Sequence, residues 1–104
     1  MRAEKAIRKQ VAAKKIEKDI EVINKLGLHA RPSSMLVKLT TQFQSDIYIR
    51  KDSDEVNGKS IMGIITLAAG KGTILRFIIS GVDAQEAMDR IEQLFLSKFG
   101  EDKE

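Results

Sequence analysis

Residues 27–34, with the sequence GLHARPSS, mark the point where an extended segment ends and a helix begins. The apolar residues between positions 20 and 23 are typical of a strand. Pro32 is favourable in the first turn of a helix, where its missing N–H removes no hydrogen bond. The segment therefore predicts a strand followed by a helix that starts at or just after His29, with the imidazole at the mouth of that helix.

The pattern on either side of this segment predicts an α+β domain. Alternating apolar and polar residues predict three further strands, near residues 47–49, 55–57 and 73–80. Two further helices are expected, one capped by Ser60 and ending near Gly70, the other capped by Asp83. The order β-α-β-β-α-β-α predicts helices packed on one face of a largely antiparallel sheet.

Composition limits the kinds of site that the chain can form. Its 104 residues are 42% hydrophobic and 32% charged, which is typical of a single globular domain. With no cysteine and one histidine, the chain has no disulfide, thiolate nucleophile or multi-histidine metal site, and we expect no cofactor. No apolar run reaches the roughly 18 residues that a membrane span needs. The lack of cysteine fits a reducing cytoplasmic location.

The net charge of +3 is distributed unevenly. Residues 1–18 contain seven basic and two acidic residues, a charge of +5, and are predicted to be a basic helical or disordered extension. Residues 19–104 contain 11 basic and 13 acidic residues, a charge of −2, and form the predicted domain. This acidic body, with Tyr48 as its single tyrosine and no tryptophan, argues against nucleic-acid binding. The extension itself is compatible with a solvated tail, a partner-binding helix, or contact with anionic lipid or nucleic acid.

The surroundings of His29 suit a phosphoryl group. A helix N-terminus provides free N–H groups and partial positive charge, and Arg31 adds a permanent cation. This field favours a neutral imidazole, which is the nucleophilic form, and would stabilise an oxyanion attached to it. From spacing alone, however, His29 is also compatible with an ordinary loop histidine and Arg31 with a solvated charge.

Two separate segments resemble one known family. GLHARPSS at 27–34 and NGKSIMGI at 57–64 are similar to two segments of HPr, the histidine-containing phosphocarrier family of the bacterial phosphoenolpyruvate:sugar phosphotransferase system. The two segments also occur in the same order and at the same spacing as in that family. The resemblance covers residues 19–99. It implies an open-faced β-sandwich, in which a four-stranded, largely antiparallel sheet has three helices on one face.

The resemblance also implies roles for residues. His29 would accept a phosphoryl group on Nδ1 from phosphorylated enzyme I and pass it to IIA proteins or domains, while Arg31 would stabilise that group. Such a chain is a carrier and not a stand-alone enzyme, and it binds proteins but not the sugar. An alternative is a regulatory or nitrogen-branch relative that acts mainly through protein–protein contacts.

The second segment adds a regulatory site and a docking site. Ser60 matches the serine that HPr kinase/phosphorylase modifies in some bacteria, although a helix cap would also explain it. Ile61, Met62 and Leu67 match an apolar docking patch for partner proteins. A short surface helix with apolar residues at nearly every position cannot bury all of them, which favours docking over a purely core role.

Overall fold

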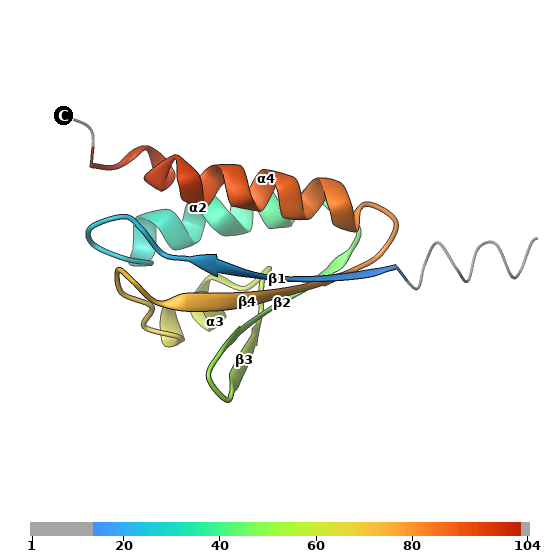
Figure 1. The fold of residues 1–104 in the computed structure, drawn as a ribbon, viewed down its shortest axis with the longest axis horizontal. Helices are drawn as coiled ribbons and strands as arrows, with labels where there is room; N and C mark the ends of the chain where they lie inside the picture. Colours follow the sequence, from blue (N-terminus) through green and yellow to red (C-terminus); the bar gives the residue numbers. More distant parts are fainter. Residues whose placement is uncertain (1–13, 103–104) are drawn as a thin grey trace, which may run out of the picture.

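The computed structural model describes residues 14–102, and the elements within that range follow the predicted order (Figure 1). They are β1 (Lys15–Glu21), α2 (Ala30–Thr40), β2 (Asp46–Lys51), β3 (Asp54–Asn57), α3 (Ile61–Thr66), β4 (Ile74–Ser80), α4 (Ala84–Leu96) and the short 3-10 turn η1 (Lys98–Gly100). Within this range, no helix is both long enough and apolar enough to cross a membrane. The predicted α+β class is confirmed.

The sheet is antiparallel throughout, with strand order β1-β4-β2-β3. Figure 1 shows α2 and α4 next to each other over one face of this sheet, while α3 packs against α2 and β3. This arrangement is the open-faced sandwich that the family resemblance implies.

Alternation along β4 explains how the sheet and helices form one core. Leu75, Phe77 and Ile79 are fully buried on the inner face, as predicted, and the ring of Phe77 meets that of Phe95 edge-on at 5.5 Å. Each buried side chain of this size stabilises the fold by about 1.5–3 kcal/mol. Arg76, between them, points to the open face. The period of two therefore fixes which face of β4 meets the helices.

The first strand begins earlier than the sequence predicts. Lys15–Lys18, assigned above to a helical or disordered extension, belong to β1, where Ile16 pairs with Ile79. Lys18 points to the helix side and forms an ion pair with Glu92 at 2.8 Å. The helix propensity of lysine and glutamate is a small preference, and pairing with a central strand outweighs it. The predicted extension over residues 1–13 lies outside the described residues.

Asp83 has a different role from the predicted one. It precedes α4 but makes no side-chain cap hydrogen bond. Its carboxylate instead accepts hydrogen bonds from the backbone N–H groups of Gln44 (2.8 Å) and Ser45 (3.0 Å) and from the Ser45 hydroxyl. Desolvation alone would raise the pKa of Asp83, but these hydrogen bonds outweigh it and hold the pKa below its ordinary value. Asp83 thus joins the start of α4 to the turn before β2.

Candidate functional site

His29 lies at the start of α2, outside the core. It is the N-cap residue, with an extended backbone (φ −75°, ψ −170°), and its side chain makes no cap hydrogen bond. The His29 carbonyl accepts the first bond of the helix from the N–H of Ser33 at 3.0 Å. The imidazole is 38% exposed. It is therefore accessible from solvent at the mouth of a helix, as the sequence predicts.

The loop before His29 is held in place by close backbone packing. Gly27 has φ +72°, and a Cβ atom there would lie only 2.6 Å from the carbonyl oxygen of Ala69. The N–H of Leu28 donates to that same oxygen at 2.9 Å. The side-chain amide of the fully buried Asn24 donates to the Gly27 carbonyl at 2.8 Å. Glycine is required here because both φ and space exclude a side chain.

The helix start leaves two backbone donors free beside the imidazole. Pro32 has no N–H, and the N–H of Ser33 is bonded to His29. The N–H groups of Ala30 and Arg31 have no hydrogen-bond partner among residues 14–102. Together with the positive end of the α2 dipole, they can bind an anionic group attached to His29.

Glu101 is a site residue that sequence reasoning missed. Its Oε2 atom lies 3.1 Å from His29 Nε2 and accepts a hydrogen bond from Arg31 Nη1 at 2.9 Å. Its Oε1 atom accepts from the Asn24 amide at 3.0 Å. The sequence signal that we overlooked is Phe99, a large apolar residue in a charged segment, which is fully buried and anchors this end of the chain.

The environment of Glu101 keeps it ionised. Desolvation by itself would raise its pKa, but hydrogen bonds from Asn24 and Arg31 and the proximity of His29 lower the pKa below its ordinary value. The site thus contains a carboxylate beside the imidazole. This negative charge opposes the positive field that we derived from the helix end and Arg31 alone.

Arg31 retains donors that could bind a second anion. Its Nη1 donates to the Phe99 carbonyl (3.2 Å) and to Glu101 (2.9 Å). The Nε and Nη2 groups have no partner within residues 14–102. A guanidinium has five N–H donors in a planar fork, so Arg31 can remain bonded to Glu101 while it contacts a phosphoryl group.

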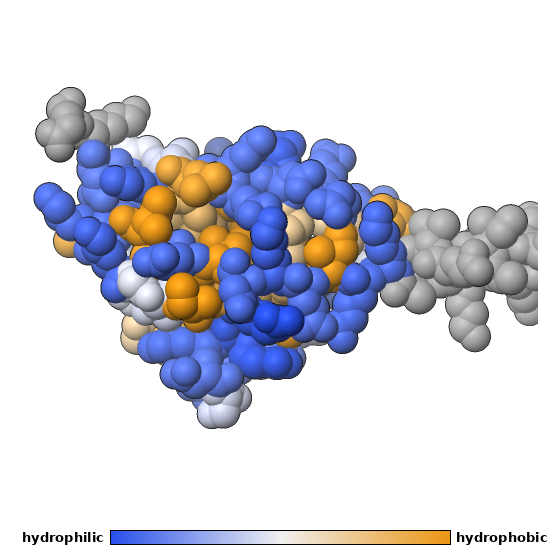
Figure 2. Space-filling model, viewed as in Figure 1, coloured by the Kyte–Doolittle hydropathy of each residue, from blue (hydrophilic) through white to orange (hydrophobic). Residues whose placement is uncertain are grey.

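Apolar residues surround His29 on the side of α3. The imidazole borders a shallow pocket of about 270 Å³ whose other walls come from the loop before α2, from α3 and from residues 68–70. Met62 is 69% exposed and Ile61 is 39% exposed, as expected for docking residues. Leu26, which lines the same pocket as His29, is 73% exposed and is an apolar surface residue that the sequence reasoning missed. On the face drawn in Figure 2, orange apolar patches lie between hydrophilic residues.

Leu67 does not belong to this surface. It follows α3 as its C-cap residue and is only 3% exposed, because it turns inward to the hydrophobic core. The predicted assignment of Leu67 to partner docking is therefore wrong. Ile61 and Met62 lie one helical turn or more before it, on the side of α3 that faces solvent.

Ser60 caps α3 as predicted. Its Oγ accepts a hydrogen bond from the N–H of Gly63 at 3.0 Å. Gly63 leaves little room beside it, since a Cβ atom there would lie 3.3 Å from that Oγ. The structure thus shows a structural use for the Ser60 hydroxyl.

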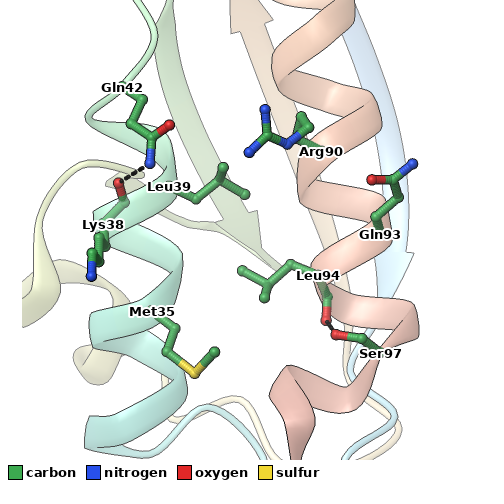
Figure 3. Close-up of a pocket in the computed structure, with 8 residues that line it drawn as sticks. All are labelled: Met35, Lys38, Leu39, Gln42, Arg90, Gln93, Leu94 and Ser97. Atoms are coloured by element: carbon green, nitrogen blue, oxygen red, sulfur yellow. Dashed lines mark hydrogen bonds between the residues drawn. The ribbon is translucent and has the colours of Figure 1, made fainter.

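A larger groove lies away from His29, between α2 and α4 (Figure 3). Its volume is about 460 Å³, and Met35, Leu39 and Leu94 form its apolar floor. The polar side chains of Gln42 and Ser97 on its rim bond to backbone carbonyls of their own helices. This groove contains none of the site residues predicted from the sequence.

Comparison with known proteins identifies the family. Residues 16–97 match the family model described as "PTS HPr component phosphorylation site". The chain belongs to the HPr family. Phosphocarrier protein HPr of Neisseria meningitidis serogroup B is 45% identical over 86 residues, 83% of this chain and 97% of that protein. HPr-like protein Crh of Bacillus subtilis is 41% identical over 76 residues, 73% of this chain and 89% of that protein.

Solved HPr structures share the fold. The HPr-C-His structure from Thermoanaerobacter tengcongensis has a TM-score of 0.81 and 42% identity, covering 85% of this chain and 99% of that one. The Bacillus anthracis HPr structure has a TM-score of 0.73 and 40% identity, covering 76% and 94% of the two chains. HPr proteins are phosphocarriers of the phosphotransferase system and not catalysts in their own right. The predicted family and fold are thereby confirmed.

Proposed function

We propose that His29 of this chain accepts a phosphoryl group from phosphorylated enzyme I and passes it to IIA proteins or domains. The observation that supports this proposal best is the position of the single histidine, exposed at the start of α2 beside Arg31 and two backbone N–H groups that have no partner within residues 14–102. Family membership supplies the classes of partner.

The reacting atom is Nδ1 of His29. Nε2 faces the Glu101 carboxylate at 3.1 Å, so the other ring nitrogen is the one available to an incoming phosphoryl group. In the loading step, the Nδ1 lone pair attacks phosphorus, the Nδ1–P bond forms, and the bond from phosphorus to the enzyme I group breaks. The electron pair of the broken bond leaves with that group. In the unloading step, a nucleophile of the IIA protein forms a new bond to phosphorus while the Nδ1–P bond breaks, and the electron pair of the broken bond returns to Nδ1.

Transfer with purified proteins tests this proposal. The full chain is incubated with enzyme I and ³²P-labelled phosphoenolpyruvate, and then with a IIA protein. We expect one acid-labile phosphoryl group per chain, lost from the chain as IIA becomes labelled. No labelling of the chain in the presence of active enzyme I would contradict the proposal.

We propose further that Ile61 and Met62 dock partner proteins. Both are exposed on α3, the helix whose Ile65 lines the His29 pocket, and exposed apolar side chains close together commonly mark an interface. We exclude Leu67 from the surface because it is buried. The surrounding polar rim would provide orientation more than affinity.

Met62 and Leu67 form a matched pair for testing docking. Met62→Ala is expected to weaken enzyme I binding about tenfold with almost no loss of stability, because its side chain is exposed. Leu67→Ala is expected to lower the free energy of unfolding by about 2–4 kcal/mol, since it empties space in the core. Calorimetry of binding and chemical unfolding distinguish the two effects. Equal binding by the Met62 variant and the unchanged chain would remove Met62 from the interface.

Ser60 is the proposed regulatory site. Its hydroxyl lies at the positive end of α3, where a phosphate would gain from the helix dipole instead of disrupting the helix. The modification would therefore act mainly by adding negative charge next to Ile61 and Met62, which would repel an acidic partner.

Incubation with HPr kinase/phosphorylase and ATP tests this site. We expect one acid-stable phosphate on the chain, an unchanged circular dichroism spectrum and slower loading by enzyme I. Ser60→Ala, the control, is expected to take up no phosphate and to lose about 1 kcal/mol of stability with the cap. Phosphate uptake by Ser60→Ala would place the modification elsewhere.

The second candidate function is that of a regulatory or nitrogen-branch member of the family. Similarity to the Crh proteins, which are named HPr-like, supports this alternative. The IIA protein that accepts the phosphoryl group distinguishes the transport function from the regulatory one. Rapid transfer to a sugar-specific IIA protein supports the transport role, whereas transfer only to a regulatory IIA protein supports the alternative.

A further inference from the structure

The chain after α4 folds back onto the His29 site. Phe99 is fully buried and its ring packs against that of Phe95 at 4.9 Å. Two residues later, Glu101 reaches His29 and Arg31, and Asp102 accepts a hydrogen bond from the N–H of Lys25 at 2.7 Å. The segment is thus fastened on both sides of Glu101, which fixes where its carboxylate lies.

The Glu101 carboxylate is held by three groups at once. Asn24 binds one oxygen at 3.0 Å, while Arg31 and His29 share the other at 2.9 Å and 3.1 Å. The Glu101 side chain is only 14% exposed. Asn24 is itself fully buried and fixed to the Gly27 carbonyl, so the carboxylate has a rigid support. An exposed surface ion pair would lack this degree of orientation.

We propose that Glu101 is a positioning residue for phosphoryl transfer: it accepts the hydrogen bond of His29 Nε2–H, and thereby keeps the lone pair on Nδ1. This inference rests on the proposed function of His29 and deepens it. In a neutral imidazole, one nitrogen bears the proton and the other bears the lone pair, so a fixed acceptor at Nε2 determines which nitrogen can attack.

The same contact affects the loaded state. When Nδ1 forms a bond to phosphorus and the proton stays on Nε2, the ring acquires a positive charge, which the Glu101 carboxylate balances at 3.1 Å. When the Nδ1–P bond breaks, the ring leaves as neutral imidazole. If Nε2 lost its proton first, the leaving group would be an imidazolate anion, a much poorer one. Glu101 therefore keeps loaded His29 in the form that gives up its phosphoryl group.

Glu101 is the acidic group that faces the ring within the described residues. From α2, Arg31 contributes a cation, but it is bonded to Glu101 and to the Phe99 carbonyl. The pocket wall formed by α3 and residues 68–70 contributes apolar residues and glycine, none of which titrates: Ile65, Ala68, Ala69 and Gly70. Asp102 is directed to the N–H of Lys25. If an uncharged residue replaces Glu101 and the pH dependence of phosphoryl transfer changes, the change is therefore attributable to the lost carboxylate.

Nuclear magnetic resonance of the ¹⁵N-labelled full chain tests the positioning directly, without any phosphoryl donor. In the unchanged chain, we expect a single neutral tautomer protonated at Nε2, with an Nε2–H signal that persists above neutral pH. Glu101→Ala should broaden or abolish that signal and populate both tautomers. Asp102→Asn, the matched control on the same segment, removes a charge but keeps an oxygen that can accept the hydrogen bond from the N–H of Lys25, so it should leave the His29 spectrum unchanged. An unaltered His29 spectrum in Glu101→Ala would overturn the proposal.

The pH dependence of phosphoryl transfer is a second measurement, and it would not change if the role of Glu101 were purely structural. For Glu101→Gln, which keeps the shape but loses the charge, donation to IIA should fall roughly tenfold at alkaline pH and less as the pH is lowered, because solvent then supplies the proton that Glu101 otherwise retains on Nε2. Asp102→Asn should follow the unchanged chain across this pH range. A pH profile for Glu101→Gln that matches the unchanged chain would refute the inference while leaving His29 as the acceptor. Failure of enzyme I to label the unchanged chain would instead refute the proposed function.

Discussion

The His29→Ala variant is expected to fold normally and to accept no phosphoryl group from enzyme I. His29 is the single histidine of the chain, so no second imidazole can replace it. Its side chain makes no cap hydrogen bond and is partly exposed, so its removal should change stability by less than about 1 kcal/mol. The measurement is ³²P transfer from labelled phosphoenolpyruvate through enzyme I, with circular dichroism as the check on folding.

The unchanged chain in the same reaction, treated with acid, is the control for the kind of bond formed. We expect its label to be lost on acid treatment, as for a phosphorus–nitrogen bond. Labelling of folded His29→Ala at the rate of the unchanged chain would show that the acceptor is another residue. Loss of the fold in this variant would contradict our assignment of His29 to the exposed helix start.

Arg31→Ala is expected to slow phosphoryl transfer by about 10²–10³-fold, because it removes a preorganised cation from the place where negative charge increases in the transition state. Its Nε and Nη2 donors have no partner within residues 14–102 and so remain available to a phosphoryl group. Arg31 itself is more than half exposed, so loss of its ion pair with Glu101 should cost no more than about 1 kcal/mol of stability. Rapid-quench measurement of the loading rate checks the expectation.

Arg31→Lys separates charge from geometry at this position. Lysine keeps the positive charge but lacks the planar fork that bonds Glu101, the Phe99 carbonyl and an anion together. We therefore expect a loading rate between those of the unchanged chain and Arg31→Ala. A loading rate in Arg31→Ala equal to that of the unchanged chain would remove Arg31 from the mechanism.

Much of the site could be predicted from local sequence because its residues are close together in the chain. His29, Arg31 and Pro32 lie within one helical turn, so recognising the helix start was enough to place the imidazole beside free N–H groups. Ser60 was recognisable as a cap for the same reason, since its partner Gly63 is three residues away.

Which apolar residues face solvent could not be predicted in the same way. Met62 and Leu67 belong to one nearly continuous apolar run, and hydrophobicity does not distinguish them. The direction in which each side chain points depends on how α3 packs against α2 and β3, which places Leu67 in the core and Met62 in solvent. Similarly, Lys15–Lys18 resemble helix formers by composition but join β1 because β4 offers hydrogen bonds along its edge.

By itself, the sequence determined the α+β order, the antiparallel sheet and the histidine at a helix mouth, because periodicity, caps and turns are local properties of the chain. Only the tertiary structure placed Glu101 against His29, 72 residues away, and Asp83 against Ser45, 38 residues away. Contacts of this kind depend on packing between distant segments, and no spacing rule along the chain encodes them. The charge balance around the reactive imidazole was therefore decided by the folded chain.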